Sequence, residues 1–160
     1  KNFDVFFEAS YANQTLFFDI WVESAKSLAS SSSLFSSVWQ KNWGIWNGNV
    51  VEVFLQKKSS SHYEEFIVDF NSCCYWYGTI KPRAINYCPI GIPPIYHVQE
   101  NHVHIQWPIE GEAKDYVGNI HACLGDGACR EYFGIKLKAT DAPDFHQPEF
   151  FVAMSDYVAR

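Results

Sequence analysis

The sequence carries little positive charge and no long apolar run. Its 160 residues include 12 Lys and Arg against 18 Asp and Glu, which gives a formal net charge of −6. Binding to a phosphate backbone needs clustered Lys and Arg, so this balance argues against nucleic acid as a partner. No apolar run reaches the ~18 residues that a membrane-spanning helix needs. We therefore expect no nucleic-acid partner and no membrane span.

Motifs of the common enzyme classes are also missing. The sequence has no G-x-S-x-G, no P-loop, no H-E-x-x-H and no dinucleotide fingerprint. Glu64, Glu65 and Asp69 lie along one strand-like run, with Glu64 pointing opposite to the other two. Nothing in the sequence places a second carboxylate at the distance from any of them that a glycosidase needs. We expect a protein that is not an enzyme and that holds no cofactor.

Length and composition favour one all-β domain. A chain of 160 residues fits a single domain, and we expect it to cover residues 1–160. Aromatic residues reach 18%, and aromatic side chains fit the pleated surface of a sheet. The chain opens at Lys1 with no initiator Met and no signal peptide, so we expect that a leader has been removed or the chain trimmed.

Short strand-like runs separated by turn signals predict a two-sheet antiparallel β-sandwich, immunoglobulin-like or jelly-roll-like. A hairpin turn is expected at Tyr11-Ala12-Asn13-Gln14. The expected strands are Val5–Ala9, Leu16–Val22, Val50–Gln56, His62–Phe70, Cys74–Ile80, His102–Trp107, Asn119–Leu124, Glu131–Leu137 and Phe150–Met154.

Two stretches interrupt this pattern. The Ser- and Ala-rich stretch Glu23–Gln40 is a long loop or a short helix, and we expect at most one or two short helices in the whole chain. The stretch Ile80–Tyr96 contains four prolines, which exclude a central strand and predict an ordered surface excursion.

Four segments in order carry more specific information. They are Trp43-Gly-Ile-Trp46-Asn-Gly-Asn-Val-Val-Glu52-Val-Phe, His62-Tyr-Glu-Glu-Phe-Ile-Val-Asp-Phe70, Cys123-Leu-Gly-Asp-Gly-Ala-Cys-Arg-Glu-Tyr-Phe133 and Ala142-Pro-Asp-Phe-His-Gln-Pro-Glu-Phe-Phe151. Together they resemble the family 9 carbohydrate-binding modules over about Phe6 to Phe151. The resemblance implies a β-sandwich that binds a sugar or glycan end, and an extracellular or cell-envelope (periplasmic) location.

The resemblance also implies a ligand site. Trp46 matches the family's stacking platform, Glu52 its sugar-binding carboxylate, and His121 lies where the family has a hydrogen-bonding glutamine. Trp43 is a further candidate platform. Sugars present apolar C–H faces to aromatic rings, and a carboxylate accepts bonds from vicinal hydroxyls. The alternative from the residues alone is that the two tryptophans cap the sandwich end and that Glu52 is merely solvated; the Gly/Asn-rich loop around Trp46 favours its exposure.

The chain departs from the family at two positions. Ile67 stands where the family has a binding arginine, and only Ile135 or Leu137 is present where it has a second tryptophan. These departures keep a scaffold or interaction module without ligand binding as an alternative. A second alternative is a sandwich that binds haem b through axial ligands. The candidate ligands are Met154, His97, His102, His104, His121 and His146.

Cysteines and histidines leave further alternatives open. Cys123 and Cys129 flank a turn and either form a disulfide in an oxidising compartment or remain buried thiols. Together with His121 they are also a candidate zinc cluster, although the sequence lacks the paired C-x-x-C of a typical zinc site. His102 and His104 share one strand face, which is either solvated or part of a metal site with a third ligand. We expect His146 to fix the last loop against the sheet.

Overall fold

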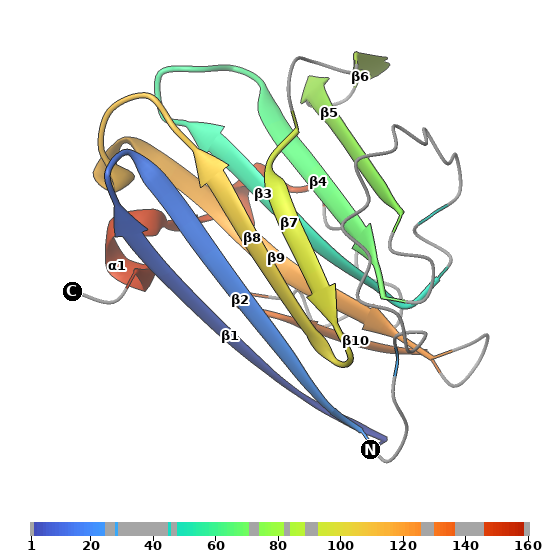
Figure 1. Ribbon diagram of the computed structural model, residues 1–160. Helices are drawn as coiled ribbons and strands as arrows, with labels where there is room; N and C mark the ends of the chain where they lie inside the picture. Colours follow the sequence, from blue (N-terminus) through green and yellow to red (C-terminus); the bar gives the residue numbers. More distant parts are fainter. Residues whose placement is uncertain are drawn as a thin grey trace.

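The computed structural model describes residues 2–24, 28, 45, 48–70, 74–81, 84–88, 93–125, 130–136 and 146–158. These residues form two antiparallel sheets in two layers, with a short helix α1 (Met154–Tyr157) near the end of the chain (Figure 1). The predicted all-β sandwich is confirmed. Within the described part of the chain, no helix combines the length and apolarity needed to cross a membrane.

The small sheet has four strands in the order β1-β2-β8-β7. Their bounds are β1 (Phe3–Ala12), β2 (Thr15–Ser24), β7 (Ile95–Gln99) and β8 (His102–Pro108). The β1–β2 hairpin closes through Asn13 and Gln14, whose φ angles are 49° and 56°. A two-residue loop with positive φ at both positions matches the twist of the strands it joins. The hairpin turn predicted at this place is therefore confirmed.

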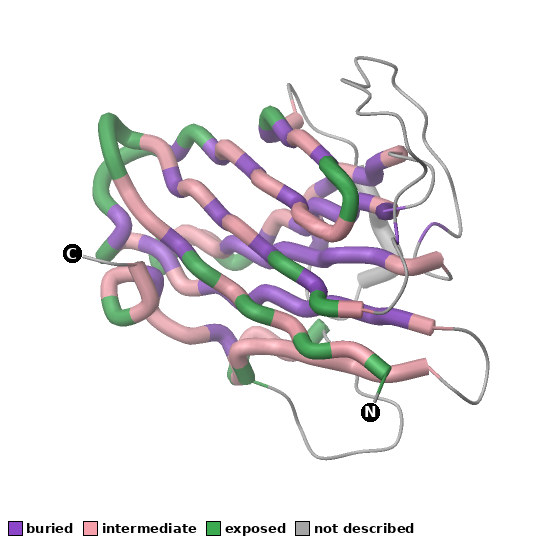
Figure 2. Tube along the Cα trace, turned by 60° about the horizontal axis from the view of Figure 1, so that its bottom comes forward, coloured by how far each residue is buried: buried purple, intermediate pink, exposed green. Residues whose placement is uncertain are grey.

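The large sheet has seven strands in the order β10-β9-β3-β4-β5-β6, with β11 paired to β9. Their bounds are β3 (Val50–Lys57), β4 (Tyr63–Asp69), β5 (Tyr75–Lys81), β6 (Ala84–Cys88), β9 (Tyr116–Leu124), β10 (Glu131–Gly134) and β11 (Val152–Ala153). Strand β3 lies between β4 and β9 and is buried along most of its length, unlike the alternating strands of the small sheet (Figure 2).

Strand β3 sends apolar side chains to both of its faces. Val51, Val53 and Leu55 point into the main core between the two sheets, as their alternation predicts. Val50 and Phe54 point to the opposite face of the large sheet and belong to a second apolar cluster. We call this opposite side the far face of the large sheet. Because both faces are covered, the sequence of β3 is nearly continuous in apolar residues.

The proline-rich stretch differs from its prediction. It contains strand β6 and the start of strand β7, where we expected an ordered surface excursion. Both are edge strands, one in each sheet, so the exclusion of a central strand was right. The prolines precede or follow these strands in sequence, and Pro at such positions removes no hydrogen bond from the ladder.

Two other predicted strands are shorter than expected. Strand β10 ends at Gly134, three residues before the predicted end. In the predicted strand Phe150–Met154, Val152 and Ala153 form strand β11, between a 3-10 turn (Pro148–Phe150) and helix α1. Pro148 favours the turn because its φ suits the first position of a helical segment.

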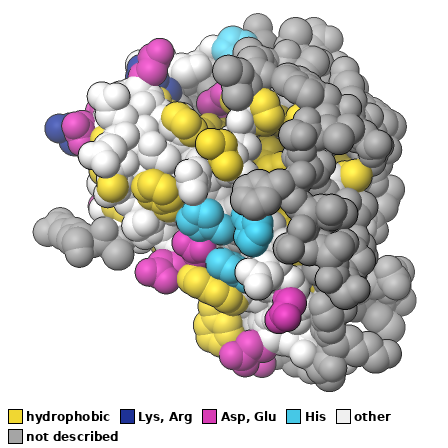
Figure 3. Space-filling view, viewed as in Figure 1, with side chains coloured by type: hydrophobic (Ala, Val, Ile, Leu, Met, Phe, Trp, Pro, Cys, Tyr) yellow, Lys and Arg dark blue, Asp and Glu magenta, His cyan; other side chains and the backbone are white. Residues whose placement is uncertain are grey.

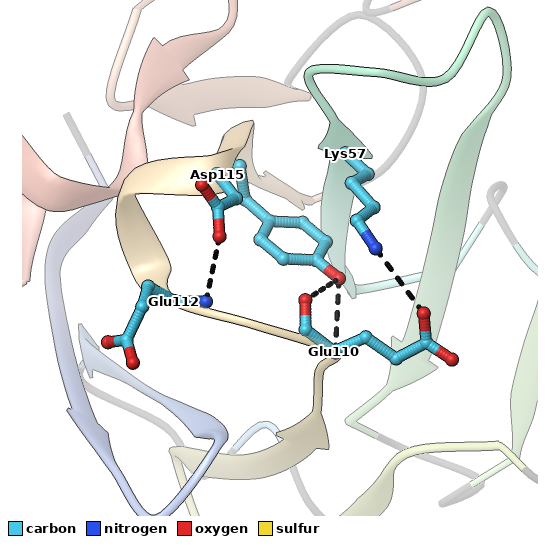
Figure 4. Close-up of polar contacts among 5 residues, drawn as sticks. Lys57, Glu110, Glu112 and Asp115 are labelled. Carbon is cyan, nitrogen blue, oxygen red and sulfur yellow. Dashed lines mark hydrogen bonds and ion pairs between the residues drawn. The ribbon is translucent and has the colours of Figure 1, made fainter.

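A hydrogen-bonded corner carries the chain from the small sheet to the large one, between β8 and β9 (Figure 4). The buried Tyr116 hydroxyl donates to the carbonyl oxygen of Glu110 (3.1 Å) and accepts from its N–H (3.2 Å). The Asp115 carboxylate accepts from the N–H of Glu112 at 2.9 Å. Lys57 meets Glu110 at 3.3 Å on the exposed rim of the corner.

Tyr116→Phe is expected to destabilise the protein by about 1–2 kcal/mol, since it deletes a hydroxyl that bonds both the N–H and the carbonyl group of Glu110. The readout is the midpoint of urea unfolding followed by fluorescence. Lys57→Met is the matched control, because an exposed ion pair contributes under about 1 kcal/mol. Equal midpoints for Tyr116→Phe and the wild type would show that the corner does not depend on the hydroxyl.

Candidate functional site

Polar side chains gather in the middle of the far face of the large sheet. Glu52 on β3 lies directly opposite His121 on β9 and Ile67 on β4. Glu65 on β4 lies opposite Phe54, which places it diagonally across from Glu52. Diagonal neighbours on adjacent strands are within reach of long side chains. We call Glu52 and Glu65 the carboxyl pair.

Burial controls the charge of the carboxyl pair. Glu52 and Glu65 are only 5% and 4% exposed. Burial raises the pKa of Glu52 from 4.5 to about 7, against the attraction of the Arg130 guanidinium, which lowers it. Burial also raises the pKa of Glu65 well above its ordinary value, and the nearby charge of Glu52 raises it further. The fold therefore favours the protonated form of both groups.

His121 is the third buried polar residue of this region. It is 1% exposed, and its ring meets the Phe54 ring edge-on at 5.4 Å. Burial lowers its pKa to about 3, although a hydrogen bond with the backbone of Lys136 raises it. The imidazole is therefore neutral at physiological pH, with one ring nitrogen as donor and the other as acceptor.

His146 connects the carboxyl pair to the protein surface. Its Nδ1 lies 2.8 Å from the Tyr63 hydroxyl, and its Nε2 lies 3.9 Å from Glu65 Oε1. The ring also packs edge-on against Phe54 at 5.5 Å, while 42% of the side chain stays exposed. The prediction that His146 holds the last loop against the sheet is confirmed by its contacts with β3 and β4.

Arg130 supplies the positive charge of the site. It precedes β10, and its Nη2 donates to the carbonyl oxygen of Gly48 at 3.0 Å. Its guanidinium also lies 5.9 Å from the centre of the Tyr132 ring. Arg130 and Tyr132 are half-buried, so together with the exposed His146 they form the rim through which solvent meets this region.

The structure brings together two of the four predicted site residues. Glu52 and His121 are direct cross-strand partners, although both are buried rather than open to solvent. Trp43 and Trp46 lie outside the described residues. Ile67, which replaces the arginine of the resembled family, is buried beside Glu52 in the far-face cluster.

Three polar residues of the site were missed or misjudged at the level of sequence. No second carboxylate was expected near Glu65, and the structure corrects this by placing it beside Glu52. Tyr63 shares the face of Glu65 by simple alternation, which was the available signal. Arg130 had a similar signal, because it lies two residues before Tyr132, which is paired with Cys123 on β9.

The thiol of Cys123 is buried at the edge of the same cluster. Burial raises the pKa of this thiol, which keeps it protonated. Cys129 lies outside the described residues, so the disulfide and the zinc cluster that involve it stay predictions.

The remaining metal and haem candidates are dispersed. His102 and His104 both contact Asp19, and no group of three His, Cys, Asp or Glu among the described residues is arranged to hold a metal ion. Met154 is buried in the core between the sheets. The candidate haem histidines lie on outward-facing positions of the two sheets or, for His146, against the far face. The described residues thus do not assemble the predicted haem ligands.

Comparisons with known proteins bear on the fold. No protein-family model and no curated protein matches the sequence. Among solved structures, a "putative carbohydrate-binding protein" from Bacteroides uniformis matches with a TM-score of 0.68 and 14% sequence identity, covering 93% of this chain and 76% of that chain. The two proteins share a fold. At this level of identity the match supports the sandwich architecture and does not identify a ligand.

Proposed function

We propose that this protein is a non-catalytic carbohydrate-binding module whose ligand site lies over the far face of the large sheet. The observation that carries the proposal is the carboxyl pair, buried beneath a rim that combines a guanidinium, an imidazole and an aromatic ring. Donors, acceptors and an aromatic surface in one place suit a ligand with many hydroxyls and apolar C–H faces.

The rim residues take the direct contacts in this proposal. The guanidinium of Arg130 and the ring of His146 donate to or accept from sugar hydroxyls, and the Tyr132 ring offers an apolar surface. Glu52 and Glu65 act from below: burial raises the pKa of both, so the pair neutralises the positive charge of Arg130 less than two fully ionised carboxylates would and leaves it available to a ligand oxygen.

Trp46 remains the proposed stacking platform, with Trp43 as a further candidate. Its near neighbours in sequence are attached to the site: Ile45 is buried in the far-face cluster, and the carbonyl of Gly48 accepts from Arg130. The N–H of Gly48 also donates to the carbonyl of Ile45 at 3.0 Å. Described residues before and after Trp46 in the sequence are therefore tied to the site.

The finer parts of the proposal come from the resemblance to family 9 carbohydrate-binding modules. They are recognition of a sugar or glycan end and an extracellular or cell-envelope location. Support comes from the ordered motifs of the sequence and from the fold shared with the Bacteroides uniformis protein, whose description names carbohydrate binding.

The carboxyl pair also invites comparison with glycosidases, which use two carboxyl groups. In a retaining enzyme one of the two must be an ionised nucleophile, and in an inverting enzyme one must be an ionised base. Here both carboxyl groups are buried, with only 5% and 4% of Glu52 and Glu65 exposed, so neither reaches a glycosidic bond held at the surface. This favours binding over hydrolysis.

The test is isothermal titration of the purified protein with a panel of mono- and oligosaccharides, alongside an assay for released reducing ends. We expect saturable binding without sugar release, and affinity at least tenfold weaker in Arg130→Met and in Trp46→Ala. Lys57→Met, which removes a cation far from the rim, is the matched control and should bind like the wild type. Folding of each variant is checked by its urea midpoint.

Three results would overturn the proposal. Unchanged affinity in both Arg130→Met and Trp46→Ala would place the ligand elsewhere. Release of reducing ends that stops in Glu52→Gln would make the protein a glycosidase. Absence of binding to every sugar by a folded protein would favour the scaffold alternative. Ile67 also favours that alternative, because it replaces the binding arginine of the resembled family.

A further inference from the structure

The small sheet exposes an unusual face on the opposite side of the molecule. Its strands alternate, so every second residue points away from the main core. The outward positions, which we call the outer face, are Asp4, Phe6, Glu8 and Ser10 on β1, Phe17, Asp19, Trp21 and Glu23 on β2, His102, His104 and Gln106 on β8, and Ile95, His97 and Gln99 on β7. Figure 3 shows histidine side chains together on this side, with acidic and hydrophobic side chains around them.

Two large aromatic side chains on the outer face are exposed to solvent and not packed in the core. Phe6 is 51% and Trp21 36% exposed. The register places Phe6, Trp21, His102 and Gln99 in one row across all four strands. Within this row the Trp21 and His102 rings stack with their centres 4.9 Å apart and their planes within 2°. Each of these two rings therefore covers one face of the other, which leaves the ring edges and the second face of Trp21 to contact a ligand.

Hydrogen bonds hold these rings in fixed orientations. Asp19 Oδ1 lies 2.8 Å from both His102 Nε2 and His104 Nδ1, so each imidazole donates to the same carboxylate oxygen. The other nitrogen of His104 then accepts from Gln106 Nε2 at 3.3 Å. These bonds connect side chains of β2 and β8 on the outer face. Their effect is to orient the rings before any ligand arrives, which lowers the entropy lost on binding.

A surface pocket lies at the end of this row. It has a volume of about 530 Å³ and lies between the Phe6–Trp21–His102 row and the β7–β8 turn. Besides these rings, its lining includes the side chains of Glu23, Gln99 and Glu100, which offer carboxylate and amide groups at the border of the aromatic surface. An aromatic floor with hydrogen-bonding groups along its border is suited to one face and the edge of a sugar ring.

The charge of the outer face narrows the class of sugar. Its acidic positions are Asp4, Glu8, Asp19 and Glu23, with Glu100 in the adjoining turn, and none of its positions is Lys or Arg. Carboxylates accept hydrogen bonds from hydroxyl groups, whereas they repel uronate, sulfate and phosphate groups.

We propose that the outer face is a second ligand site, which binds an uncharged saccharide chain by stacking on Trp21 and hydrogen bonding to Glu23, Gln99 and Glu100. It lies on the other sheet from the far-face site and shares no residue with it. The proposal therefore stands or falls independently of the function proposed above.

The test is affinity electrophoresis through gels that contain barley β-glucan, galactomannan or xylan, with carboxymethylcellulose as the anionic counterpart. The protein carries Arg130→Met throughout, so that the far-face site does not contribute. We expect at least one neutral polysaccharide to retard this protein and carboxymethylcellulose to leave its mobility unchanged. Trp21→Ala should raise the dissociation constant obtained from the retardation by about tenfold, which is the usual effect of removing a central aromatic side chain from a binding interface.

Ile95→Ala is the matched control, because Ile95 is 58% exposed on the same face but outside the pocket. It should migrate like its parent, and Trp21→Tyr should retain most of the retardation by restoring a ring. Equal retardation of Trp21→Ala and Ile95→Ala would overturn the proposal, as would retardation by carboxymethylcellulose as strong as by the neutral chains. A dimer in sedimentation that only Trp21→Ala dissociates would also overturn it, by assigning the face to a second copy of the chain.

Discussion

Gly118→Ala is expected to destabilise the protein by about 3 kcal/mol, at the upper end of the usual cost of overpacking. Gly118 lies on β9, with Leu55 of β3 on one side and Val152 of β11 on the other. A Cβ at this position would come well inside van der Waals distance of the Phe54 carbonyl oxygen, which is backbone and cannot rotate away. It would also touch the Met154 methyl group at 3.4 Å. The central strands of the large sheet would have to separate.

Thermal unfolding followed by circular dichroism measures this effect. For a chain of this size, about 3 kcal/mol corresponds to a Tm lower by roughly 10 °C. Gly48→Ala is the matched control: its Cβ would approach Asp69 Oδ1 at 3.2 Å, the end of a side chain that can move. We expect that variant to lose under about 1 kcal/mol. Equal Tm values for the two variants would show that β3 and β9 are not as close as the structure has them.

Glu52→Gln is expected to make the protein more stable at pH 8 and to change it little at pH 4.5. Because the pKa of Glu52 is raised to about 7 in the fold, the folded state binds its proton more tightly than the unfolded state does. The stability that this proton contributes is complete below about pH 4.5 and is lost as pH rises towards 7. The loss is on the order of 3 kcal/mol for a group buried this fully. Glutamine has the shape of the protonated acid and does not ionise.

Urea unfolding at pH 4.5 and pH 8 tests this prediction. The wild type should lose stability between the two values, and Glu52→Gln should lose less. Glu110→Gln is the control for the change in net charge, since this carboxyl is exposed. An equal loss in Glu52→Gln and the wild type would contradict the prediction. Glu65→Gln should act in the same direction as Glu52→Gln, because burial and the charge of Glu52 raise its pKa too.

The far-face site was only partly predictable from the sequence. The motif with Glu52 and the position of His121 singled out two residues that the structure sets side by side. The link between Glu65 and Glu52 needs the register of the β3–β4 hairpin, and one residue of slip would turn Glu65 to the other face. Burial was also ambiguous, because alternation alone cannot tell a solvated face from one covered by a second cluster.

Local chemistry determined much of this protein. Alternating apolar residues and the Asn13-Gln14 turn specify strands and a hairpin, since side chains in a strand change sides at every residue. Tertiary structure alone decided the rest. It covered the far face, which buried the carboxyl pair and raised its pKa values, and it aligned Trp21 with His102 across strands 81 positions apart in sequence. Both depend on which strands become neighbours, and the energy of that choice is distributed over contacts that no local segment contains.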